Sequence, residues 1–90
     1  MPRKEKVVKV IDSDSFLTDR RKHPVRLQNV DTPKKGQRGY GEAKKALRDL
    51  IQGQVVTIYT QARDRNSGSV AKVKLGNKSI NKAMNALEIS

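Results

Sequence analysis

The feature that most constrains the fold is one amphipathic helix set between runs of short, alternating segments. Its apolar residues recur at intervals of three and four and form a single stripe: Ala43, Ala46, Leu47, Leu50 and Ile51. Before it, residues 6–11, 15–18 and 24–30 have the alternation of strands. After it, residues 54–60 and 70–75 are rich in β-branched or alternating residues and predict two further strands.

Turn and cap residues separate these segments. Gly53 is a plausible end for the helix, and Ser79 is expected to cap a second, short helix that contains Ile80, Ala83, Met84 and Leu87. Residues 32–39 and 61–69 are predicted loops. The resulting order βββαββα is that of the OB-fold, a five-stranded Greek-key barrel with its first helix plugging one end. Such barrels commonly bind oligonucleotides.

Length and composition set the scale of this barrel. Ninety residues suit one domain, which we place at residues 7–90, with residues 1–6 as a basic lead-in. Apolar residues make up 34% of the chain and there are only three aromatic residues, so the core must be small and mainly aliphatic. The chain has no cysteine, which excludes disulfides and thiolate metal sites.

The charge of the chain points to an anionic partner. A net charge of +11 favours nucleic acid first and an acidic membrane surface second. No apolar run approaches membrane-spanning length, and no hydrophobic signal region follows the basic N-terminus. We therefore expect a cytoplasmic protein without a membrane partner; the oligomeric state stays open.

Five short motifs, in order, resemble the staphylococcal nuclease (thermonuclease) family. Their residues are Val8 to Ser15, including Asp12-Ser13-Asp14; Val25-Arg26-Leu27 through Asp31-Thr32-Pro33; Lys35-Gly36 with Tyr40-Gly41-Glu42-Ala43; Asp64-Arg65 followed by Val70-Ala71; and Ser79-Ile80-Asn81 with Ala83-Met84. Each motif alone is weak, whereas five in the right order and spacing are specific. The family also has a third helix, with base-contacting tyrosines near it, for which the sequence has no counterpart before Ser90.

The resemblance implies a set of site residues. Calcium ligands of the family correspond to Asp14, Asp31 and the carbonyl of Thr32, and an arginine that contacts the scissile phosphate corresponds to Arg26. Two further family residues are replaced. Lys34 stands where a glutamate positions or deprotonates the attacking water, and Gly68 stands where a second arginine stabilises the developing charge.

These replacements bear directly on catalysis. A protonated lysine cannot serve as a base and repels Ca²⁺, and phosphoryl transfer depends largely on stabilising charge in the transition state. Arg65 lies three residues too early to replace the lost arginine, and Asn66 takes the place of the loop tyrosine. Ser13 also replaces the turn glycine of the family.

Several site residues have a second interpretation. Asp14 and Asp31 either form a residual Ca²⁺ site or are turn and strand-end residues that Lys34 neutralises through a local salt bridge. Arg26 contacts either a phosphate or one of the two aspartates.

A basic cluster lies within residues 20–48, where two acids oppose ten cations: Arg20, Arg21, Lys22, Arg26, Lys34, Lys35, Arg38, Lys44, Lys45 and Arg48. It is either a phosphate-binding surface or an ordinary solvated face. With so few aromatic residues, sequence-specific recognition by base stacking is not expected.

The sequence thus favours a catalytically inactive or severely impaired nuclease-like domain that binds DNA or RNA through phosphates and requires no cofactor. A weak Ca²⁺-dependent phosphodiesterase is the first alternative, and a protein-interaction platform is the second.

Overall fold

A computed structural model of the chain describes residues 2–63 and 68–87. It contains six strands and two helices in these residues. In chain order they are β1 (Arg3–Val10), β2 (Ser15–Thr18), β3 (Val25–Leu27), α1 (Tyr40–Ile51), β4 (Val55–Arg63), β5 (Ser69–Leu75), β6 (Lys78–Ser79) and α2 (Ile80–Asn85).

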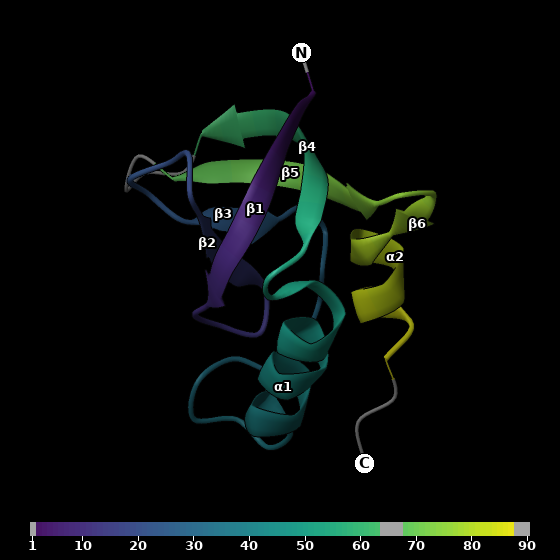
Figure 1. Cartoon of the computed structure of the whole chain (residues 1–90). Coiled ribbons are helices and arrows are strands. Elements are labelled where there is room, and N and C mark those ends of the chain that lie inside the picture. Colours follow the sequence, from purple (N-terminus) through teal and green to yellow (C-terminus); the bar gives the residue numbers. More distant parts are fainter. Residues whose placement is uncertain (1, 64–67, 88–90) are drawn as a thin grey trace.

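The first five strands close into a barrel (Figure 1). Their order is β3-β2-β1-β4-β5, and β3 returns to pair with β5, which completes the circle. That closing pair is parallel, with Arg26 opposite Val70, whereas the other barrel pairs are antiparallel. The expected five-stranded OB-fold barrel is therefore confirmed.

The core has the mainly aliphatic character expected from the composition. Every barrel strand and both helices supply its buried side chains, which are Val7, Val10, Phe16, Val25, Leu27, Ala43, Leu47, Ile51, Val56, Ile58, Ala71, Val73, Ile80 and Met84. The buried α1 residues belong to the apolar stripe seen in the sequence. In Figure 1, α1 lies across the lower end of the barrel and α2 packs beside β5.

The helices begin and end close to where their capping residues predict. Gly53 follows α1 with a φ of 82°, a left-handed conformation that glycine adopts without steric cost. The Ser79 side chain accepts a hydrogen bond from the Lys82 N–H across 3.3 Å and caps α2, as expected.

The start of the chain departs from the predicted pattern. β1 begins at Arg3, not at residue 6, so residues 3–5 are not a frayed lead-in. They pair with β4, with Glu5 opposite Val56. Strict alternation would place Val8 and Val10 on one face, but only Val10 is buried, because the register with β2 shifts between Val7 and Lys9. This bulge buries Val7 and leaves Val8 49% exposed.

Three other boundaries differ from the expected ones. β3 stops at Leu27 because Asn29 takes a φ of 56°, which an extended strand cannot contain. β4 continues to Arg63 through a register shift between Thr60 and Ala62, so the loop is shorter than predicted. The two-residue β6 was not predicted, and it pairs back on β5 across the Gly76-Asn77 turn.

Candidate nucleic-acid interface

The β1–β2 loop and the β3–α1 loop meet at Asp14. This residue ends the β1–β2 loop, and its carbonyl oxygen accepts a hydrogen bond from the Leu27 N–H of β3 across 2.8 Å. The Asp14 side chain is 7% exposed, so a buried carboxylate lies beside the outer face of β3. The β2–β3 pairing places Ser15 opposite Arg26, which brings that arginine to the same place.

Two cations approach the Asp14 carboxylate. The Lys34 ammonium forms an ion pair with Oδ2, and Arg26 Nε lies 3.8 Å from the same oxygen. The other oxygen, Oδ1, accepts a hydrogen bond from the Ser15 hydroxyl at 3.1 Å. The salt bridge between Lys34 and Asp14, one of the two interpretations drawn from the sequence, is therefore present. About half of each cationic side chain stays exposed, 54% for Arg26 and 48% for Lys34.

A chain of hydroxyl groups holds the Lys34 segment against the β1–β2 loop. The Thr32 hydroxyl donates to Ser13 Oγ over 3.1 Å, and the Ser13 hydroxyl donates to the carbonyl oxygen of Pro33 over 2.6 Å. Ser13 is fully buried and Thr32 is 5% exposed. Because these bonds fix residues 32 and 33, they also fix the position from which Lys34 reaches Asp14.

Asp31 lies differently from Asp14. Asp31 is exposed, and its backbone N–H donates a hydrogen bond to Asn85 Oδ1 of α2 at 2.9 Å. Within residues 2–63 and 68–87, no three carboxylate, histidine or cysteine side chains converge on a point where a metal could bind. With Lys34 already on Asp14, these donors do not fit a divalent cation, because the ammonium takes the place where positive charge is needed.

Gly68 is buried and directly precedes β5. The next residue, Ser69, pairs with Val25 and donates its N–H to the Pro24 carbonyl across 3.2 Å. Gly68, which the resemblance drawn from the sequence aligns with an arginine, thus lies beside β3, two residues before the partner of Arg26. Residues 64–67, which include Arg65 and Asn66, lie outside the described residues.

Tyr40, at the start of α1, belongs to the surroundings of the same loop. The pKa of the Tyr40 hydroxyl is raised, first by burial and next by the negative charge of Asp12. A hydrogen bond to Asp12 and the charge of Asp14 raise it further. The helix entry is thereby placed beside the aspartates of the β1–β2 loop.

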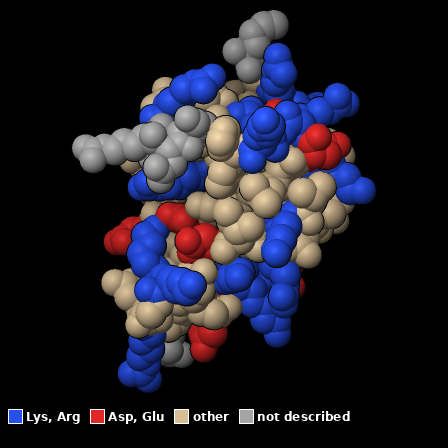
Figure 2. Space-filling view, turned by 90° about the vertical axis from the view of Figure 1, so that its left-hand side faces the viewer, with Lys and Arg blue, Asp and Glu red and all other residues tan. Residues whose placement is uncertain are grey.

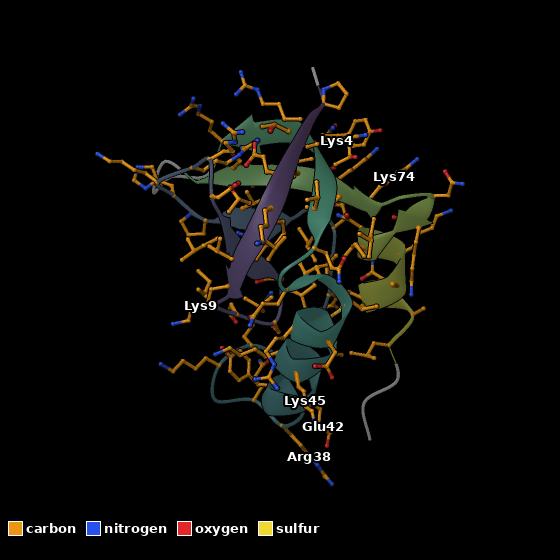
Figure 3. All side chains as sticks on the ribbon, viewed as in Figure 1. Lys4, Lys9, Arg38, Glu42, Lys45 and Lys74 are labelled. Atoms are coloured by element: carbon orange, nitrogen blue, oxygen red, sulfur yellow. The ribbon has the colours of Figure 1, made fainter. Side chains whose placement is uncertain are left out.

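The ten-residue basic cluster is divided by the fold. Arg20, Arg21 and Lys22 lie in the β2–β3 loop, beside the end of β4. Arg38 and Lys45 lie at the α1 end of the molecule, as Figure 3 shows. Figure 2 shows Lys and Arg over much of one face, with small groups of acids among them. The cluster therefore does not form one patch, and lysines outside it, such as Lys4 and Lys74, extend the positive surface (Figure 3).

One polar group was missed from the sequence. Glu5 is only 3% exposed and accepts hydrogen bonds from the Thr18 hydroxyl at 2.6 Å and from Arg21 Nε at 2.9 Å. Burial raises the pKa of the Glu5 carboxyl, but the Arg21 and Thr18 hydrogen bonds and the charges of Arg21 and Arg3 outweigh it, so that the net pKa is lowered. The signal was available, since Glu5 and Val7 share one side of the alternating β1 pattern.

The fold and this site define a small OB-fold domain of the nuclease type. A family model described as staphylococcal nuclease homologue matches residues 24–86, which is more than half of the chain. The chain therefore belongs to the staphylococcal nuclease family. A search of curated proteins gives no match. Within residues 2–63 and 68–87, neither helix is long and apolar enough to cross a bilayer.

Proposed function

We propose that this chain binds nucleic acid through backbone phosphates without a metal ion and without cleaving the strand. The observation that carries the proposal is the engagement of Asp14 by Lys34 and Arg26. In family nucleases, the equivalent carboxylate holds Ca²⁺. Here a cation built into the chain is in contact with it.

The charge balance at this site favours an anionic ligand. Asp14 neutralises one of the two cations, and the other charge is left for a phosphate. Both Arg26 and Lys34 keep about half of their side chains in solvent, so a phosphate can reach them. A guanidinium fork next to an ammonium suits phosphate oxygens, with Arg supplying geometry and Lys a compact charge.

The same residues argue against hydrolysis. Lys34 pairs with Asp14 as a cation and offers no carboxylate to position or deprotonate the attacking water. Gly68 supplies no charge to the pentacoordinate transition state, and loss of one such group typically costs about 10²–10³ in rate. Binding and cleavage thus separate in this chain, because phosphate binding needs only the two cations that remain.

Fluorescence anisotropy with labelled single-stranded and duplex DNA and RNA tests the proposal. We expect binding to persist in EDTA, to be unaffected by Ca²⁺ and to weaken with salt, with a logarithmic slope of about −0.9 per neutralised phosphate on duplex DNA. Salt-insensitive binding, or no binding at low salt, would overturn it. Strand scission on adding Ca²⁺, followed on a denaturing gel, would establish the weak phosphodiesterase instead.

Variants locate the contact. Arg26→Gln and Lys34→Gln should each lower the affinity and reduce the magnitude of the salt slope by about one. Lys78→Gln, on the exposed two-residue strand β6, removes the same charge elsewhere and serves as the matched control. Equal losses in all three variants would mean that general charge, not this site, binds the strand.

A further inference from the structure

A second concave site lies away from Asp14, where the β2–β3 loop meets the start of β1 and the end of β4. It is a cleft of about 290 Å³. Among its described lining residues, five are cations and one is an acid: Arg3, Arg20, Arg21, Lys22, Arg63 and Glu5. They come from three parts of the chain that the closed barrel brings together.

The ion pair between buried Glu5 and partly buried Arg21 lines this cleft. Arg21 Nε lies 2.9 Å and 3.0 Å from the two Glu5 oxygens, and Arg21 Nη1 donates to Ser69 Oγ across 2.8 Å. The Thr18 hydroxyl, at 2.6 Å, fills a further acceptor site of Glu5. The guanidinium is therefore held in one orientation, and Glu5, the one acid among the described lining residues, is already paired with its own neighbours.

The remaining lining residues leave an excess of positive charge. Arg3, Arg20, Lys22 and Arg63 converge on the cleft, whereas the Glu5 charge is balanced by Arg21. Like charges gathered in a concavity repel each other, and the walls strengthen the field inside it. A single phosphodiester, with one charge, offsets only a part of this excess.

We propose that this cleft binds a phosphate group that carries close to two negative charges, as a phosphate monoester or a diphosphate does. Phosphate monoesters have a charge of about −1.5 to −2 at neutral pH and three strong acceptor oxygens. Arginine forks match those oxygens. Such a group occurs at the end of a nucleic-acid strand and in free nucleotides, and the chemistry of the cleft is the same for both. The site is separate from the Asp14 site and goes beyond the proposed function.

The test uses inorganic pyrophosphate as the probe in an NMR titration at low salt. We expect amide shifts concentrated at residues 20–23 and 69. In the double variant Arg20→Gln/Arg63→Gln, both exposed positions, the dissociation constant should rise by at least about tenfold, because charge-assisted hydrogen bonds are lost. The double variant Arg38→Gln/Lys45→Gln, which removes two charges at the α1 end (Figure 3), should leave it unchanged. Shifts scattered over all basic residues, or an equal loss in both double variants, would overturn the proposal.

Oligonucleotides then identify the source of the phosphate. A strand with a terminal phosphate that binds more tightly than its hydroxyl-ended twin, with the preference lost in Arg20→Gln/Arg63→Gln, would assign the cleft to strand ends. If the two strands bind with equal affinity while pyrophosphate still binds, the cleft would be assigned to free phosphate compounds. If pyrophosphate does not bind, this inference is overturned even when strands still bind through Arg26 and Lys34. The proposal for the cleft and the proposed function therefore fail independently.

Discussion

The Ser13 hydroxyl donates to the carbonyl oxygen of Pro33 over 2.6 Å, and the residue after Pro33 is Lys34, which contacts Asp14. Two residues that differ from the nuclease motifs expected from the sequence are thus joined in space. Ser13 supplies the bond that positions Lys34. The site is therefore a connected arrangement of residues.

Replacing Ser13 tests this connection. Ser13→Ala removes the hydroxyl and leaves the Pro33 carbonyl and the Thr32 hydroxyl without their partner, so we expect the free energy of unfolding to fall by about 1–3 kcal/mol. Oligonucleotide affinity should fall with it, because Lys34 is held less firmly. Thr57→Val, on β4, removes a hydroxyl outside this chain of hydroxyl groups and is the control. Unchanged stability by urea unfolding would contradict the prediction.

Restoring the two family residues should restore catalysis in part. In Lys34→Glu/Gly68→Arg we expect Ca²⁺-dependent cleavage about 10²–10³ above the wild-type background, because the site regains a water-positioning carboxylate and a charge for the transition state. Cleavage of a labelled strand with Ca²⁺ and with EDTA measures it. Lys34→Gln/Gly68→Ala is the matched control. If the restored variant stays inactive, the two substitutions do not account for the loss, and Ser13 is the next residue to revert.

The Asn81 side chain should be the most costly amide in the protein to remove. Its Oδ1 accepts from the Val73 N–H at 2.7 Å, and its Nδ2 donates to the carbonyls of Gln28 and Ala71 at 2.9 Å and 3.1 Å, across the β3–β5 seam. Asn81→Ala removes the partner of the Val73 N–H and of the Gln28 carbonyl, each at a cost of about 1–3 kcal/mol, whereas the Ala71 carbonyl keeps its bond from the Gln28 N–H.

Asn85 offers a matched control for that prediction. The Asn85 side chain also makes two hydrogen bonds from α2, with the Asn29 carbonyl and the Asp31 N–H. Asn85 is exposed, however, so water can take the place of its amide in both bonds. Asn85→Ala should therefore cost about 1 kcal/mol or less. Chemical unfolding of both variants measures the difference, and equal losses would show that the seam is not what Asn81 stabilises.

Acid should weaken the fold through Glu5. Since the pKa of Glu5 is lowered in the folded chain, the unfolded chain binds the proton first as the pH falls. The stabilisation from Glu5 is complete above the unfolded pKa of about 4.3 and is lost as the pH falls through the lower folded pKa. Glu5→Gln should flatten the pH dependence of the unfolding free energy in this range. A slope unchanged in Glu5→Gln would contradict this.

The periodicity of apolar residues was sufficient to predict the order of strands and helices, but it did not predict the bulge in β1. The α1 stripe and the alternation around Val25 and Val73 identified the elements, because burial on one side of a helix or strand leaves a regular pattern. The bulge after Val7 was invisible, since a one-residue insertion in the register is set by the partner strands and not by the local sequence.

For the candidate site, the sequence predicted which residues take part but not how their charges pair. Asp14, Arg26 and Lys34 were identified, but two pairings of their charges were equally consistent with the sequence, and the contact between loops decides between them. Glu5 was missed because its partners, Thr18 and Arg21, lie on another strand and loop.

The parallel β3–β5 pair has a consequence for how the protein is made. β3 leaves the ribosome more than forty residues before Ala71, its partner across the seam, and the amide that secures the seam comes later still, at Asn81. During synthesis, the nascent chain therefore has an open sheet with two unpaired edges, β3 and β4, until β5 emerges. Premature termination before α2 would release a species prone to self-association, so cellular quality control has a defined interval in which to act on this small barrel.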